Sequence, residues 1–293
     1  MKSHLSIIVP VHTIPNGEEL SALARWSRDI PDECELIFSL DLEREDKSLR
    51  DWCEEYLPSR KRIVQQLNRN PGETRNVGMK LATGDWLAFV DSDDIFYPRS
   101  ALTAIEYFGE SSDLIVCRYQ TLDLNYNLIK ESPNLEKLSE LIINLGFWRC
   151  LYRRAFAACA TFPPLRMAED QVFFSRILSF NPRVSFSNEF IYNYVIGGDQ
   201  QLTKSIDAKE DLRTAISILQ SEINSSRIFM KFRKQLLLRQ YTSLLNFSGM
   251  TDRIKYSCKL LPFLIRPSYF VCLVSLIPLL VKNRFNNSRV EEL

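Results

Sequence analysis

Apolar runs typical of buried strands alternate with amphipathic segments typical of helices over residues 5–90. Strands that alternate with helices form βαβ units, which imply a mostly parallel sheet flanked by helices. In such a sheet, ligands bind at the carboxyl ends of the strands. We therefore expect an α/β fold with strands at residues 5–10, 35–40, 63–65 and 86–90, separated by helices at residues 18–29, 47–57 and 74–81. A further helix is expected at Leu135–Leu145.

Two of the predicted strand ends are acidic. Asp41 follows the second strand, and Asp91, Asp93 and Asp94 follow the fourth. Because side chains alternate along a strand, Asp91 and Asp93 are predicted to point the same way and to offer oxygen ligands to a hard divalent ion. Such an ion neutralises the charge that develops on a diphosphate leaving group. The alternative is a solvated acidic turn or a helix N-cap, where Asp is common.

Further motifs surround these acids, in the order Ser6–Val11, Glu35–Asp41, Asn70–Gly78, Ala82–Asp94, Phe147–Arg154 and Ala168–Phe174. Together they resemble the nucleotide-binding core of the family 2 glycosyltransferases over about residues 5–205. The resemblance implies the GT-A fold, which is Rossmann-like, with a mostly parallel sheet flanked by helices. It also implies a nucleotide-sugar donor and a divalent metal, Mn²⁺ or Mg²⁺, held by Asp91 and Asp93.

The same resemblance implies donor-binding residues. Asp41 stands where the family has an acid that contacts the base, and Ser92 lies within the acidic motif of the donor site. Arg75 is predicted to place a cation on the donor phosphate or base, or else to be a surface arginine that packs through its stem. Pro10 and Val11 are expected to line the nucleoside pocket, although an ordinary strand end explains them nearly as well.

The chain departs from the family pattern in two places. The usual Asp-Asp-Gly-Ser after the second strand is here Leu40–Glu43, so the contacts to the donor base are expected to differ. Some family members complete the metal shell with a late histidine, whereas this chain has only His4 and His12. The third protein ligand is therefore missing, supplied by another group such as Asp199, or replaced by water.

The acceptor side is predicted around a helix that begins at Glu169-Asp170. Transfer to a hydroxyl group needs a general base within hydrogen-bond reach. The resemblance implies that Asp170 is this base and that direct attack inverts the anomeric carbon, while Glu169 orients the acceptor or supports the loop. The alternative is that both acids complement the helix N-terminus. Trp148 either stacks on a sugar or belongs to the core, and Tyr192–Lys204 occupies the place of a mobile lid.

Composition bounds the partners and the compartment. The 37 basic and 36 acidic residues leave a net charge of +1, which argues against a dedicated nucleic-acid binder. None of the seven cysteines has C-x-x-C spacing, so we expect reduced thiols in a reducing compartment. The first apolar run is too short for a signal peptide. A cytoplasmic location is therefore expected.

The C-terminal part is basic and apolar. Between Thr251 and Arg289, seven basic residues oppose the single acid Asp252 and flank two apolar runs, Leu260–Ile265 and Tyr269–Val281. The second run is shorter than the ~20 residues of a spanning helix. Such a segment favours contact with an anionic membrane surface, on the inner face of the cell membrane. The alternative is a helical subdomain that packs on the catalytic core or on a second subunit.

These patterns predict a GT-A domain at residues 1–205 and a helical appendage at residues 206–293. The predicted function is metal-dependent, inverting transfer of a sugar to a glycan or a lipid-linked glycan. One alternative is a nucleotidyltransferase, which usually carries a Gly-rich basic loop where this chain has His12–Asn16. Another is a non-catalytic scaffold or glycan-binding relative, against which the joint presence of Asp91, Asp93 and Asp170 argues.

Overall fold

The computed structural model describes residues 5–11, 17–28, 30–41, 51, 61–68, 70–141, 145–197, 208–222 and 227–246. The chain divides into two compact units, formed by Met1–Asn134 with Gly146–Lys204 and by Leu135–Leu145 with Ser205–Leu293. The predicted division at residue 205 remains a proposal. Residues 135–145, which the sequence analysis assigned to the first domain, group with the second unit.

The first unit contains a nine-stranded sheet, whose strands are β1 (Leu5–Val11), β2 (Cys34–Leu40), β3 (Lys61–Gln65), β4 (Trp86–Phe89), β5 (Ile95–Phe96), β6 (Leu114–Leu122), β7 (Leu128–Glu131), β8 (Cys150–Arg153) and β9 (Val184–Val195). Their order is β3-β2-β1-β4-β8-β6-β9-β5, and β7 pairs with β6 off this path. Strands β1 to β4 pair in parallel, and β6 is parallel to β9. Strand β8 is antiparallel to β4 and to β6 and joins the two groups.

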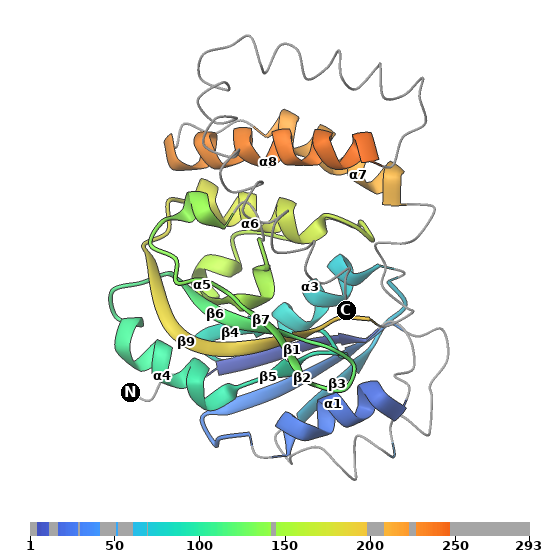
Figure 1. Cartoon of the computed structure of the whole chain (residues 1–293), viewed down its shortest axis with the longest axis vertical. Helices are drawn as coiled ribbons and strands as arrows, with labels where there is room; N and C mark the ends of the chain where they lie inside the picture. The colour runs from blue at the N-terminus through green and yellow to red at the C-terminus, as the bar shows by residue number, and fades with distance from the viewer. Residues whose placement is uncertain are drawn as a thin grey trace. The chain divides into compact units, whose positions relative to one another are not determined.

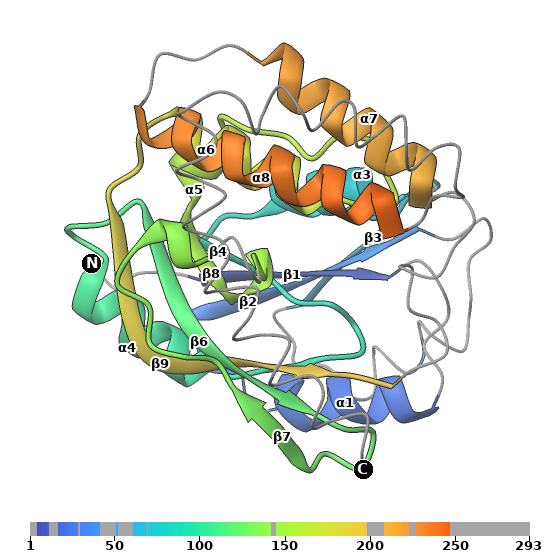
Figure 2. The same cartoon turned by 45° about the horizontal axis from the view of Figure 1, so that its top comes forward.

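Helices cover both faces of this sheet, namely α1 (Gly17–Ser27), α3 (Pro71–Leu81), α4 (Pro98–Phe108), α5 (Arg154–Ala157) and α6 (Glu169–Ser179). Helices α3 and α6 lie on one face, and α1 and α4 lie on the other (Figures 1 and 2). The predicted α/β class with a mostly parallel sheet is therefore confirmed.

The described helices of the second unit are α7 (Ala208–Ser221) and α8 (Arg227–Asn246), which pack on each other. The amide of Gln220 donates a hydrogen bond of 3.0 Å to the Tyr241 hydroxyl across this contact. Within the described residues, no helix is long and apolar enough to cross a membrane. The basic segment from Thr251 onward lies outside the described residues.

An aromatic core lies at the carboxyl end of β4. The ring of Phe89 lies 5.2–5.8 Å, between centroids, from the rings of Phe147, Tyr152, Phe162 and Phe173. Strands β1 and β4 are buried along their whole length, as expected for central parallel strands covered on both faces. This packing fixes the strand end from which the acidic residues follow.

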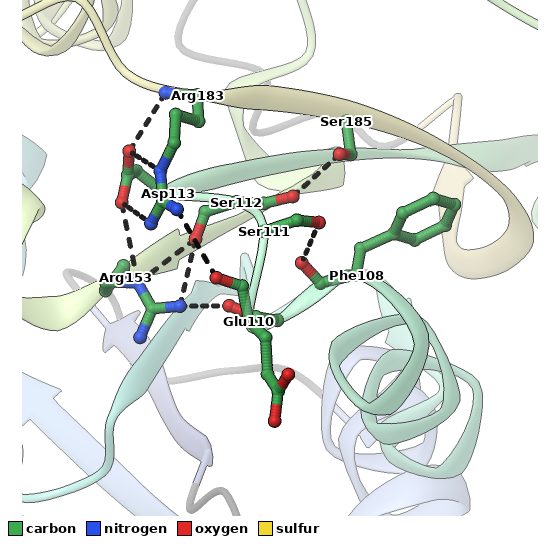
Figure 3. A network of polar contacts seen from close by, with 9 residues as sticks. Phe108, Glu110, Ser111, Ser112, Asp113, Arg153, Arg183 and Ser185 are labelled. Carbon is green, nitrogen blue, oxygen red and sulfur yellow. Dashed lines mark hydrogen bonds and ion pairs between the residues drawn. The ribbon is translucent and has the colours of Figure 1, made fainter.

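A polar network lies at the other end of these strands, near the start of β4 (Figure 3). The Asp113 carboxylate accepts two hydrogen bonds of 2.9 and 3.0 Å from the Arg183 guanidinium and one of 2.9 Å from the Arg183 amide. Arg153, at the end of β8, lies 3.6 Å from the same carboxylate and donates to the carbonyl oxygens of Gly109 and Ser112. The network therefore ties the starts of β6 and β9 to the end of β8.

Two local predictions differ from the structure. The helix expected at Leu135–Leu145 is, where described, a short 3₁₀ turn, η1 (Leu138–Glu140). The fourth strand ends at Phe89, because Asp91 accepts a hydrogen bond of 3.1 Å from the Asp94 amide and so begins a turn. The alternation of side chains used to orient Asp91 and Asp93 therefore does not extend to them.

Candidate active site

The acidic turn after β4, Asp91–Asp94, is fixed by one tyrosine of β9. The Tyr192 hydroxyl donates a hydrogen bond of 2.6 Å to Asp94 and accepts one of 3.1 Å from the Asp91 amide. Asp94 also accepts a hydrogen bond of 2.7 Å from the Val195 amide. Burial, together with the neighbouring Asp93 and Asp91, raises the pKa of the Asp94 carboxyl well above its ordinary value. Asp94 is therefore a buried anchor of the turn.

The other two acids of the turn are accessible. The side chain of Asp91 is 30% exposed, and Asp93 is exposed, while Ser92 between them is partly buried. These carboxylates remain at the carboxyl end of β4, where ligands bind in sheets of this kind. Their predicted roles in holding a metal and the donor stay predictions.

The motif Asn70–Gly78 forms the start of α3 and places Arg75. Asn70 caps the helix by accepting a hydrogen bond of 2.8 Å from the Glu73 amide, and Pro71 occupies the first turn, where its missing N–H is harmless. A Cβ atom on Gly72 would lie 2.3 Å from the Pro163 carbonyl oxygen, so this close approach requires glycine.

The following residues of α3 lock the helix to its neighbours. The Asn76 side chain donates a hydrogen bond of 2.9 Å to the Phe162 carbonyl oxygen and accepts one of 2.9 Å from the Phe162 amide. A Cβ atom on Gly78 would lie 2.5 Å from a methyl group of Ile8 in β1, so the helix packs directly on the sheet. Arg75 therefore projects from a backbone that is held on two sides.

Arg75 connects the acidic turn to the start of α6. Its guanidinium lies 2.7 Å from Asp91 and 2.7 Å from Glu169, and the side chain is only 5% exposed. The guanidinium also lies 4.7 Å from the ring centre of Phe147 and 5.7 Å from that of Phe162. A surface location is therefore wrong for Arg75. The cation is held by two carboxylates, and its predicted contact with the donor remains a prediction.

The two acids that begin α6 differ in environment. Glu169 is buried, and burial raises the pKa of its carboxyl, while the Arg75 guanidinium opposes that rise. Asp170 is only partly buried. Ala168 precedes both acids with a φ of 65°, a left-handed conformation that costs energy for a residue with a Cβ atom. Of the two roles predicted for Glu169, support of the loop fits this burial, and the base role of Asp170 stays a prediction.

The residues predicted on the nucleoside side are buried. Pro10 and Val11 are buried in β1. The Asp41 carboxylate accepts hydrogen bonds of 2.6 Å from the Asn68 amide and 3.2 Å from the Thr74 hydroxyl, so it holds the loop before α3. The predicted contacts of these residues with the donor base stay predictions.

Trp148 is buried with 8% of its surface exposed, in the turn η2 (Phe147–Arg149). Its ring stacks on Tyr192 at 4.3 Å and on Tyr194 at 5.5 Å. The interpretation of Trp148 as a core residue fits this position, and a stacking face for a sugar does not. Tyr192 and Tyr194 belong to β9, so the predicted lid does not begin at Tyr192, and its residues from 198 onward lie outside the described residues.

The described residues provide two of the ligands that a divalent ion would need. Mg²⁺ and similar ions are commonly held by one or two carboxylates together with substrate phosphates, and Asp91 and Asp93 supply such a pair. Within the described ranges, no group of three or more His, Cys, Asp or Glu residues is arranged around one point. His4, His12 and Asp199, considered as further ligands, lie outside those ranges.

The role of Tyr192 was missed by the sequence analysis, which named this residue only as the start of a lid. Its hydroxyl holds both ends of the acidic turn, although β9 lies about a hundred positions further along the chain. Strand alternation within Tyr192–Tyr194 is the available signal, because it places both tyrosines on one face and Asn193 on the other. That signal identifies a face of β9 but does not identify the strand end that it meets.

Comparison with known sequences gives a family match. The sequence profile of glycosyl transferase family 2 matches residues 6–167. EpsH of Bacillus subtilis (strain 168), a protein assigned to the glycosyltransferases, is 31% identical over 165 residues, 50% of this chain and 48% of EpsH. TarS of Staphylococcus aureus (strain Mu50 / ATCC 700699), a poly(ribitol-phosphate) beta-N-acetylglucosaminyltransferase, is 26% identical over 268 residues, 85% of this chain and 46% of TarS. The chain thus spans about half the length of these relatives.

Solved structures share the fold. S. aureus TarS 1-349 in complex with UDP-GlcNAc aligns with a TM-score of 0.62 and 22% identity, over 84% of this chain and 73% of that chain. The mannosyltransferase PcManGT from Pyrobaculum calidifontis, in complex with GDP-Man and Mn²⁺, aligns with a TM-score of 0.55 and 11% identity, over 94% of this chain and 87% of that chain. The predicted GT-A fold is therefore confirmed.

Proposed function

The chain belongs to glycosyl transferase family 2, and from this premise we propose that it transfers a sugar from a nucleotide-diphosphate sugar to a hydroxyl group of an acceptor. The relatives named above are glycosyltransferases, and two solved structures of the same fold contain UDP-GlcNAc or GDP-Man. The observation that carries the proposal is the placement of Arg75 between Asp91 and Glu169, at 2.7 Å from each. This contact joins the predicted donor side to the predicted acceptor side.

On the donor side, Asp91 and Asp93 are the residues that would hold Mn²⁺ or Mg²⁺ through carboxylate oxygens. The bound ion would supply a positive charge that stabilises the diphosphate as it leaves. Arg75 keeps the Asp91 side chain in one orientation and adds a fixed positive charge beside it. Tyr192 and Asp94 hold the backbone of the same turn, so the carboxylates meet the donor in a preformed arrangement.

On the acceptor side, Asp170 is proposed as the general base that takes the proton of the attacking hydroxyl. Its neighbour Glu169 is anchored by Arg75, which fixes the first turn of α6 against α3. A base held on an anchored helix start can be positioned within hydrogen-bond reach of the acceptor oxygen. Direct attack by that oxygen on the anomeric carbon would invert its configuration.

The acceptor is proposed to be a glycan or a lipid-linked glycan. TarS is named for its action on poly(ribitol-phosphate), a polymer that carries phosphate groups. This supports including phosphate-bearing polymers among the candidate acceptors for the screen below. We further propose a cytoplasmic protein that contacts the inner face of the membrane through its basic C-terminal segment. The absence of a nucleic-acid partner is proposed on the balanced net charge of +1.

A screen of nucleotide sugars tests the proposed function. Release of UDP or GDP from each donor would be measured with and without Mn²⁺, alone and with candidate acceptors. We expect one donor to be consumed, and we expect Asp170→Asn to lower turnover by at least ~10²-fold with donor affinity nearly unchanged. The matched control is Asp85→Asn, an acid at the start of β4 and so at the opposite edge of the sheet. Turnover in Asp170→Asn equal to that of the control would remove Asp170 from the mechanism.

A further inference from the structure

Two of the described arginines are buried, Arg75 with 4% and Arg149 with 3% of its surface exposed, and they differ in their partners. Arg75 has two carboxylates at 2.7 Å. Arg149 donates one hydrogen bond, of 2.6 Å, from Nε to the Cys117 carbonyl oxygen, and its guanidinium lies 4.9 Å from the ring centre of Tyr119. Within the described part of the chain, no carboxylate pairs with Arg149.

A buried cation without an anion is unfavourable. Buried charges in proteins are normally paired or hydrogen-bonded, because transfer from water into the interior costs solvation energy. Burial accordingly lowers the pKa of the Arg149 guanidinium, and the nearby Arg118 acts in the same direction. Arg118 has its own carboxylate, Glu131, at 3.3 Å. Arg149 is therefore a second guanidinium near Arg118, and the described residues give it no carboxylate partner.

The terminal nitrogens of Arg149 have no acceptor among the described residues. Its Nε donates to the Cys117 carbonyl oxygen, and the residue as a whole is buried. The guanidinium therefore retains two terminal NH₂ groups, in a planar fork, that no described group binds.

Arg149 lies at the edge of the sheet that carries the acidic turn. It immediately precedes β8, which is antiparallel to β4, so the start of β8 meets the carboxyl end of β4. Its neighbour Trp148 stacks on Tyr192, whose hydroxyl binds Asp94. A Cβ atom on Gly146 would lie 3.3 Å from Cδ of Arg149, which shows how closely the turn holds this side chain. Arg149 is therefore positioned next to the proposed active site.

We propose that Arg149 binds a phosphate group of a substrate. The planar fork of a guanidinium matches the geometry of phosphate and forms charge-assisted hydrogen bonds with it. A bound phosphate would supply the counter-charge that the described residues do not provide. The inference rests on the proposed function for its setting, because two sources of phosphate are then present, the donor diphosphate and a phosphate carried by the acceptor.

The test is a titration of the intact chain with inorganic phosphate, at constant ionic strength adjusted with chloride. The unfolding temperature reports binding, since a ligand that binds the folded state stabilises it by mass action. We expect phosphate to stabilise the wild type, and we expect Arg149→Met to weaken the apparent affinity at least about tenfold, which corresponds to about 1.4 kcal/mol. The matched control is Arg213→Met on α7, where the arginine is paired with Glu210 at 2.9 Å. This control is expected to respond like the wild type.

A second variant, Arg149→Lys, provides a test if Arg149→Met does not fold. Arg149→Lys keeps the charge but replaces the fork with a point charge, so it is expected to bind phosphate more weakly than the wild type. If Arg149→Met does not fold, this variant decides the question. An affinity in the folded variants equal to that of the wild type, or a wild type that does not respond to phosphate, overturns the proposal.

A parallel titration in the presence of saturating UDP or GDP identifies the source. A phosphate response that disappears assigns the bound group to the donor diphosphate, and a response that persists assigns it to the acceptor. The phosphate titration requires no turnover, so its outcome is separate from that of the donor screen. A chain that binds phosphate through Arg149 but neither binds nor consumes any nucleotide sugar would contradict the proposed function and leave the Arg149 proposal standing.

Discussion

The guanidinium of Arg75 lies 2.7 Å from the carboxylate of Glu169, although the two residues are 94 positions apart in the sequence. The same guanidinium lies 2.7 Å from Asp91. One side chain of α3 therefore binds an acid that follows β4 and an acid at the start of α6. The donor and acceptor sides of the proposed site meet at this cation.

Removal of the cation should destabilise the protein. We expect Arg75→Met to lower the free energy of unfolding by about 3–5 kcal/mol, because it leaves the buried Glu169 carboxylate without its partner. Urea denaturation measures this change. The double variant Arg75→Met with Glu169→Gln should be more stable than the single variant, since the unpaired buried charge is then absent. A double variant no more stable than Arg75→Met would show that the two groups are not coupled.

The acids of the turn should separate into an anchor and an accessible pair. We expect Asp94→Ala to lower the free energy of unfolding by about 1–3 kcal/mol, because the Tyr192 hydroxyl and the Val195 amide lose their acceptor. The matched variant Asp93→Ala removes the exposed carboxylate of the preceding residue and should change stability by less than about 0.5 kcal/mol. Thermal denaturation of both variants compares them. Equal losses would mean that Asp94 is not the anchor.

The network in Figure 3 predicts a dependence of stability on pH. Hydrogen bonds from Arg183 hold the pKa of the Asp113 carboxyl below its ordinary value of 3.8. The folded protein thus favours the charged form, and the resulting stabilisation is present above that ordinary value and is lost as the pH falls through the lower pKa of the folded state. Asp113→Asn should therefore be less stable than the wild type at pH 6. The difference should shrink on acidification below pH ~4, and a difference that stays constant down to pH ~2 would contradict the assignment.

Membrane contact predicts a salt-dependent attachment. Residues 251–293 carry the basic and apolar pattern, so their removal should abolish flotation of the chain with anionic vesicles. High salt should weaken flotation of the intact chain, because it screens the attraction between basic residues and lipid headgroups. If the intact chain fails to float and the truncated chain aggregates, the segment belongs to the fold and membrane contact is ruled out.

The strands of the sheet were predictable because their signal lies in successive residues of the sequence. Runs such as Ile7–Val9 and Trp86–Phe89 are apolar over several successive positions, and a parallel strand covered on both faces requires that pattern. The helix starting at Glu169 was predicted from its acidic first turn and was confirmed to the residue. The segment Leu135–Leu145 is equally apolar but forms a short 3₁₀ turn where it is described, so apolar periodicity alone did not distinguish the two.

The site was predictable as a list of residues but not as a set of contacts. Motif order singled out Arg75, Asp91 and Glu169 without indicating that one guanidinium binds both acids, because that contact spans 94 positions. Burial of Trp148 depends on the tyrosines of β9, which lie more than forty positions further on. Long-range packing of this kind leaves no periodic signal along the chain, and the two roles of Asp93 and Asp94 were separated only by the fold.

Calorimetric titration of UDP and of GDP tests the central claim most directly, that the turn after β4 is a nucleotide-sugar site. The wild type and Asp93→Asn would each be titrated in Mn²⁺ and again in EDTA. We predict that one nucleotide binds the wild type in Mn²⁺, and that both chelation and Asp93→Asn weaken binding by at least about tenfold, or about 1.4 kcal/mol. Binding of neither nucleotide, or equal binding in all four experiments, would contradict the account.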